Sequence, residues 1–144
     1  MKTQESILAL FKSGKSGECI DGRDISRLVE FFPVSEWKHF GVELVPGEEA
    51  PELKPWTEEA ILAQLAEDVA FGFQKALDQR GISASLMYEV VRMWMWVLDD
   101  PLQDHTEYSY YGLPLFIAVA DKYGFPNPLQ GKTGSEEEYN TLYY

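Results

Sequence analysis

The sequence has a single cysteine, Cys19, and only two histidines, His39 and His105. One thiol cannot form a disulfide within the chain, so the fold must depend on its packed core. The usual zinc sites need more Cys and His ligands than this sequence contains. No apolar run reaches the roughly 18 residues that a membrane span needs, and the opening MKTQESILALFK is unlike a signal peptide. We therefore expect no zinc, no membrane span and a cytoplasmic location.

Basic residues are also scarce: 12 Lys and Arg face 24 Asp and Glu, so the net charge is −12. Proteins bind nucleic-acid phosphates through Lys and Arg, so this balance argues against that class of partner. The acids lie mainly in two connecting segments, residues 43–59 and 99–107, and in the tail at 136–138. Charges on solvated loops are screened beyond about 8–10 Å at physiological salt. They cost the fold little, and they would steer a basic partner towards the protein.

The clearest helical patterns are at residues 57–79 and 85–98. Thr57 can cap the first helix, and the two acids after it suit the positive end of a helix dipole. Apolar residues then recur at three- and four-residue steps, as a buried stripe requires. The second helix is apolar nearly all round, which predicts a central, buried position. We expect the two to form a helical hairpin against which the other helices pack.

Shorter helices are predicted around this hairpin. They cover residues 4–12, 25–32, about 35–40 and 115–123, and the last two are closed by Gly41 and Gly124. Residues 42–45 alternate but have no partner strand, so we expect extended coil there. Three prolines make residues 46–56 a loop, which we expect Leu53 and Trp56 to pin to the core. The expected fold class is mainly α, with little or no β. It is a single compact domain, 1–131, of five or six helices, followed by a loosely ordered acidic tail, 132–144.

The 57–79 helix also predicts which of its residues face solvent. The expected polar face comprises Gln64, Glu67, Asp68, Lys75 and Asp78. Phe71 falls within this polar stripe, so we expect it to be exposed or covered by a loop. An exposed Phe71, together with the all-apolar helix, leaves a homodimer possible.

The most acidic stretch that contains a histidine comprises Asp99, Asp100, Asp104, His105 and Glu107. Carboxylates can bind magnesium or calcium, but the spacing lacks the glycine and the final glutamate of a calcium loop. Asp99 and Asp100 also follow a helix C-terminus, where negative charge is disfavoured. That cost hints at a partner or an ion. Three interpretations stay open: a solvated loop, which we favour, a partner contact, and a metal or catalytic site.

Residues 77–85 resemble the turn of a helix-turn-helix in their spacing. A recognition helix must present basic and polar side chains to the major groove. The helix that follows has one arginine, one acid and otherwise core-type residues, so exposing it to DNA would be costly. We favour an ordinary turn within the helical hairpin.

These observations favour a non-enzymatic, acidic protein-binding module without cofactor or metal. It would dock on a basic protein, as immunity proteins and inhibitors do; the analogy is one of size and acidity, not of motif. Tyrosines in the acidic loops suit a binding surface because they offer large contact area at low entropic cost. The expected contact residues are Glu48, Glu49, Glu52, Phe71, Asp99, Asp100, Asp104, Glu107, Tyr108, Tyr110 and Tyr111. The alternatives are a small metal-dependent enzyme using residues 99–107 and a helix-turn-helix-like regulator.

Overall fold

The computed structural model describes residues 1–15, 25–79, 84–100, 102 and 112–125, with side chains for all of these except 73–79, 84–88 and 112–114. Within these ranges the chain is mainly helical and contains no strand, which confirms the expected fold class. The expected tail at 132–144 lies outside them.

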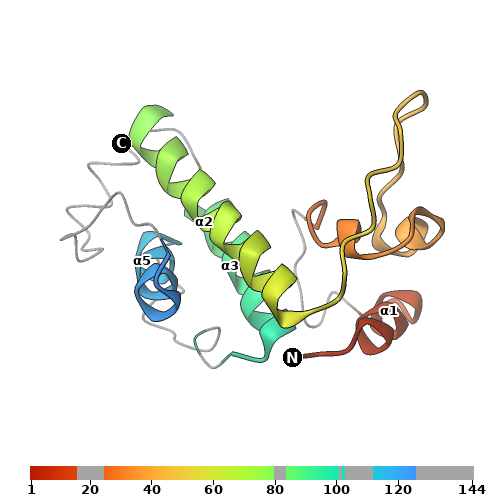
Figure 1. The fold of residues 1–144 in the computed structure, drawn as a ribbon, viewed down its shortest axis with the longest axis horizontal. Helices are drawn as coiled ribbons and strands as arrows, with labels where there is room; N and C mark the ends of the chain where they lie inside the picture. The colour runs from red at the N-terminus through yellow and green to blue at the C-terminus, as the bar shows by residue number, and fades with distance from the viewer. Residues whose placement is uncertain (16–24, 80–83, 101, 103–111, 126–144) are drawn as a thin grey trace.

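The elements are α1 (Gln4–Lys12), the 3-10 helices η2 (Val29–Phe31) and η3 (Val34–Phe40), α2 (Glu58–Gln79), α3 (Ala84–Leu98) and α5 (Gly112–Tyr123). Figure 1 shows α2 and α3 running together through the middle of the molecule. Helix α5 lies on one side of this pair, and α1 with the two 3-10 helices lies on the other.

Helix α3 is central because it contacts both α2 and α5. Val91, Trp94, Met95 and Val97 have no exposed surface, as its nearly all-apolar sequence predicts. Burying each such side chain stabilises the fold by about 1.5–3 kcal/mol, so α3 contributes a large part of the hydrophobic core. The predicted helical hairpin is therefore confirmed over the residues of α2 and α3 that are described.

The helix predicted at residues 25–32 is correct only in part. Leu28, Val29, Phe31 and Phe32 are buried, but the segment forms a turn and the short 3-10 helix η2 instead of an α-helix. Phe32 then becomes extended, with φ −126° and ψ 147°, ahead of Pro33. The residue before a proline is pushed out of the helical region, so the chain cannot continue as an α-helix here. The Trp37 indole N–H donates to the Phe32 carbonyl at 2.9 Å and holds the two 3-10 helices together.

Two predicted glycine stops are confirmed, as is the predicted end of the 85–98 helix, where the conformation of the stop was not foreseen. Gly41 and Gly124 end η3 and α5 in the left-handed conformation, with φ 73° and 70°. Asp99 ends α3 in the same way, with φ 55°. Its amide donates to the Trp96 carbonyl at 3.2 Å, and the Asp100 amide donates to the Met95 carbonyl at 3.0 Å. This is the Schellman pattern, in which glycine is commonest and aspartate is tolerated.

Residues 42–56, which we call the arm, are extended coil as expected and stand out from the helical body (Figure 1). At the tip, the Glu48 amide donates to the Val45 carbonyl at 3.0 Å, and Gly47 has φ 90°. Proline followed by a positive-φ glycine makes this a type II turn. At the root, Trp56 is partly buried against Phe31. The prediction that Leu53 also pins the arm is wrong, because Leu53 is 52% exposed.

Candidate functional site

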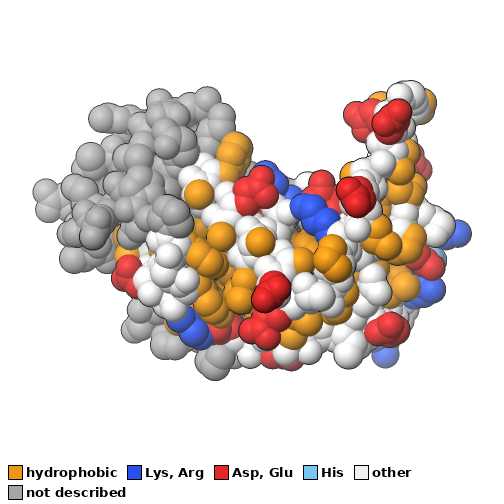
Figure 2. All heavy atoms as spheres, viewed as in Figure 1, with side chains coloured by type: hydrophobic (Ala, Val, Ile, Leu, Met, Phe, Trp, Pro, Cys, Tyr) orange, Lys and Arg blue, Asp and Glu red, His pale blue; other side chains and the backbone are white. Residues whose placement is uncertain are grey.

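The arm presents four exposed acids. Its exposed acids are Glu43, Glu48, Glu49 and Glu52, and none of them forms an ion pair with another described residue. Figure 2 shows acidic and apolar side chains sharing the arm and a hollow between the arm and the helical body. Three of these glutamates are expected contact residues. Glu43 is not among the expected contact residues, because it precedes the proline-rich stretch 46–56 that predicts a loop.

The only base of the arm, Lys54, is held at the root. Its amide donates to the Glu30 carbonyl at 3.1 Å, and its ammonium lies 2.9 Å from the Glu30 carboxylate. The ammonium also donates to the side-chain oxygen of Gln64 on α2. Lys54 therefore does the anchoring expected of Leu53, and its charge is matched locally. The outer part of the arm keeps its full negative charge.

The polar face predicted for α2 is wrong at Gln64 and Asp68, which are only 3% and 4% exposed. The Asp68 carboxylate accepts a hydrogen bond from the Trp94 indole at 2.7 Å and pairs with Arg27 Nε, also at 2.7 Å. The Gln64 amide donates to the same carboxylate at 3.1 Å. A buried carboxylate needs such donors, and two of them come from segments far away in the sequence. The helical periodicity of α2 could not predict these two donors, because it depends only on the residues of that helix.

Burial raises the pKa of Asp68, while the hydrogen bond from Trp94, the charge of Arg27 and the hydrogen bond from Gln64 partly oppose that rise. All of its polar contacts are internal. They join α2 to α3 and to the segment that precedes η2. We interpret Asp68 as a structural hub of the domain.

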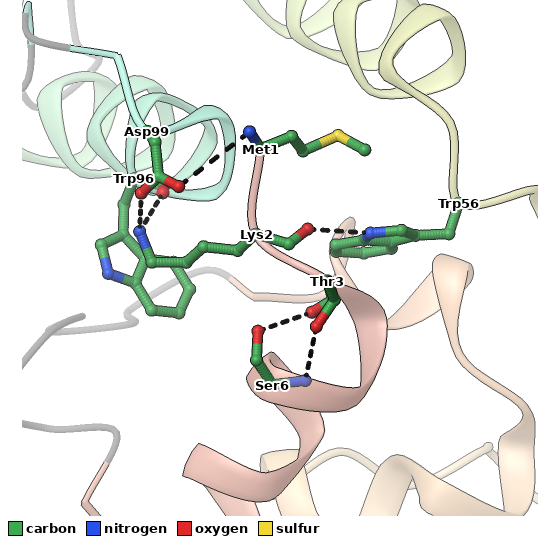
Figure 3. Close-up of polar contacts among 7 residues, drawn as sticks. All are labelled: Met1, Lys2, Thr3, Ser6, Trp56, Trp96 and Asp99. Atoms are coloured by element: carbon green, nitrogen blue, oxygen red, sulfur yellow. Dashed lines mark hydrogen bonds and ion pairs between the residues drawn. The ribbon is translucent and has the colours of Figure 1, made fainter.

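The C-terminus of α3 is capped by the first residues of the chain (Figure 3). The Lys2 amide donates to the Val97 carbonyl at 2.9 Å, and its ammonium donates to the Trp96 carbonyl at 2.8 Å. The same ammonium pairs with Asp99. A cation at this end of a helix is favourable, and these bonds satisfy carbonyls that the helix leaves free. The unfavourable position of Asp99, which hinted at an external partner or ion, is therefore compensated within the molecule.

Asp100 does not lie on a solvated loop, as the favoured interpretation expected: it is only 7% exposed. Its carboxylate accepts hydrogen bonds from Lys122 and Tyr123 of α5 and from the Leu102 amide at 2.9 Å. Burial alone would raise the pKa of Asp100, but these hydrogen bonds outweigh it and lower the pKa. Burial and the neighbouring carboxylate raise the pKa of Tyr123. Asp100 thus connects the end of α3 to α5. Because it is buried, it is no longer a candidate contact residue.

The remaining candidate residues of the acidic stretch lie outside the described residues: Asp104, His105, Glu107, Tyr108, Tyr110 and Tyr111. Over the part of the chain that is described, no group of three or more His, Cys, Asp or Glu could hold a metal ion.

Phe71 is 51% exposed on α2, which confirms the expectation of an exposed side chain there. The Arg27 guanidinium carbon lies 5.8 Å from the centre of its ring, within the range of a cation–π contact. The possible helix-turn-helix turn at 80–83 is outside the described ranges, but most of α3 from Val91 to Val97 is buried. That burial takes the C-terminal half of α3 out of reach of a DNA groove, and the side chains of residues 84–88 at its start lie outside the described ones.

Comparison with models of protein families, with curated proteins and with solved structures returns no match. Among the described helices, none is both long and apolar enough to cross a bilayer.

Proposed function

We propose that this protein is a non-enzymatic binding module, of the inhibitor or immunity type, that docks on a basic protein through its arm. The observation that supports this is that four glutamates, unpaired among the described residues, lie together on one projecting segment, whereas exposed acids of the body such as Glu5, Glu67 and Asp121 are spread over α1, α2 and α5. Asp68, Asp99 and Asp100 of the body each have a cationic partner within the domain. The four exposed glutamates of the arm have none among the described residues.

The expected role of these glutamates is to guide and orient the partner. A single exposed ion pair contributes only about 0–1 kcal/mol, so a few of them do not produce tight binding on their own. A projecting group of like charges instead raises the association rate and disfavours acidic partners. The interaction should therefore weaken with salt, over a range set by the Debye length of about 8 Å at physiological ionic strength.

The test is capture of partners from a lysate of the protein's own host. The wild type is compared with the arm variant E43Q/E48Q/E49Q/E52Q at low and at physiological salt. A matched control, E5Q/E59Q/E67Q/D121N, removes the same amount of charge from exposed positions outside the arm. We expect the wild type and the control to retain the same basic protein and the arm variant to lose it. Equal retention by the two variants would contradict the proposal.

The metal-dependent enzyme is the weaker alternative. It needs the carboxylates of residues 99–107 to be free for a cation, whereas Asp99 and Asp100 are already bonded to Lys2 and Lys122. A rise in the melting temperature with magnesium, calcium or manganese that D104A/H105A removes would favour this alternative.

A further inference from the structure

The outer part of the arm, residues 43–53, carries only acidic and apolar side chains. Between residues 43 and 53, every residue is glutamate, glycine or apolar, and no Ser, Thr, Asn or Gln is present. Val45 is 56% exposed and Leu53 is 52% exposed, and they are two of the four large hydrophobic side chains exposed over the described residues. Proline and glutamate alone are also found in stiff spacers, but such a role does not require large apolar side chains exposed beside them. This composition is closer to that of a contact surface.

The arm has a defined turn at its tip and is bonded to the helical body at its root. The type II turn at residues 45–48 sets the path of the tip, and Pro46 and Gly47 suit the two central positions of that turn. At the root, Lys54 is bonded to Glu30 and to Gln64, and the Trp56 indole donates to the Lys2 carbonyl at 3.0 Å. A loop that is ordered before it binds loses less conformational entropy on binding.

We propose that the arm inserts into a cleft of its basic partner, with Val45 and Leu53 as apolar anchors and the glutamates against a rim of Lys and Arg. This inference rests on the proposed function and adds the shape and chemistry of the partner site: a concave, apolar floor inside a cationic border. Anchors that become desolvated in a pocket control dissociation, whereas rim charges control association. The two groups of side chains therefore have separable kinetic effects.

The first part of the test locates the contact. The photo-crosslinking residue p-benzoylphenylalanine replaces Val45 or Leu53 in the full chain, or replaces exposed Ala63 on α2 as a control. After irradiation in host lysate, we expect the same basic protein to be crosslinked from both arm positions and not from the control. An adduct of two copies of this chain would overturn the proposal in favour of self-association. The absence of any adduct from both arm positions would also overturn it.

The second part measures dissociation from the protein identified in that adduct. We expect V45A/L53A to dissociate about tenfold faster or more, with an unchanged dependence on salt. V45I/L53M keeps apolar side chains of similar size and should stay within about twofold of the wild type. If V45A/L53A behaves as the wild type while the arm variant E43Q/E48Q/E49Q/E52Q still fails to bind, insertion is wrong and acidic docking stands. If only V45A/L53A weakens binding, the charge-guided function is wrong.

Discussion

Two acids of the body, Asp68 and Asp100, and the four glutamates of the arm occupy opposite environments. Asp68 and Asp100 are buried: Asp68 is bonded to Trp94 of α3 and to Arg27 ahead of η2, and Asp100 to Lys122 and Tyr123 of α5. The arm glutamates are exposed, and no described cation pairs with them. Local charge density therefore does not separate the acids that stabilise the fold of this chain from those that face solvent. The useful distinction is which carboxylates already have donors within the fold.

The largest expected effect is on folding, from removal of the Asp68 carboxylate. D68A leaves the Trp94 indole and the Arg27 guanidinium without their acceptor, so we expect a loss of about 3 kcal/mol in the free energy of unfolding. Denaturant titration measures this loss. D68N keeps an oxygen acceptor for Trp94 and should lose clearly less. A change below about 0.5 kcal/mol for D68A would remove Asp68 as the hub.

The next effect concerns Asp100. D100A removes the acceptor of Lys122, Tyr123 and the Leu102 amide, and hydrogen bonds to a charged group contribute about 1.5–3 kcal/mol. We expect a destabilisation in that range, measured in the same titration. K122A should cost less, because the Lys122 side chain is 44% exposed and the other two donors remain. If K122A and D100A cost the same, the ion pair alone would account for the role of Asp100.

The two buried aspartates should also change stability with pH in opposite directions. The raised pKa of Asp68 means that the folded state holds this proton more tightly than the unfolded state, so its contribution to stability falls as the pH rises above the ordinary value of 3.8. The lowered pKa of Asp100 gives a contribution that is present above 3.8 and lost as the pH falls below it. Unfolding measured from pH 3 to 7 should therefore show a flatter acid limb in D100N and a steeper one in D68N. The same slope in both variants would contradict this assignment.

A smaller effect is expected at the cap of α3. K2A removes the donor to the Trp96 carbonyl and the cation next to Asp99, so we expect a loss of about 1 kcal/mol. Thermal unfolding checks it against K38A, which removes an exposed lysine and should change stability by less than about 0.5 kcal/mol. Similar melting temperatures for both variants would show that the cap contributes nothing measurable.

The sequence predicted the parts of the fold that depend on local patterns. These are the α2–α3 hairpin, the Thr57 helix start, the Gly41 and Gly124 stops and the coil of the arm. It could not predict features that depend on distant contacts. From the helical period alone, Asp68 is predicted to face solvent, but the fold places Trp94 and Arg27 against its carboxylate. Asp99 is likewise predicted to be unpaired, whereas the fold brings Lys2 to it. The candidate surface was predicted in part, since Glu48, Glu49 and Glu52 are exposed while Asp100 is not.

The most direct test of the account is the salt dependence of the association rate with the captured basic partner. The arm variant E43Q/E48Q/E49Q/E52Q should keep the wild-type free energy of unfolding within about 0.5 kcal/mol, because its substituted side chains are exposed. The wild-type rate should fall about tenfold or more as salt is raised from low to physiological concentration, and the variant's rate should be low throughout and nearly flat. Equal rates and equal slopes for the two proteins would contradict the claim that the arm guides this protein to its partner.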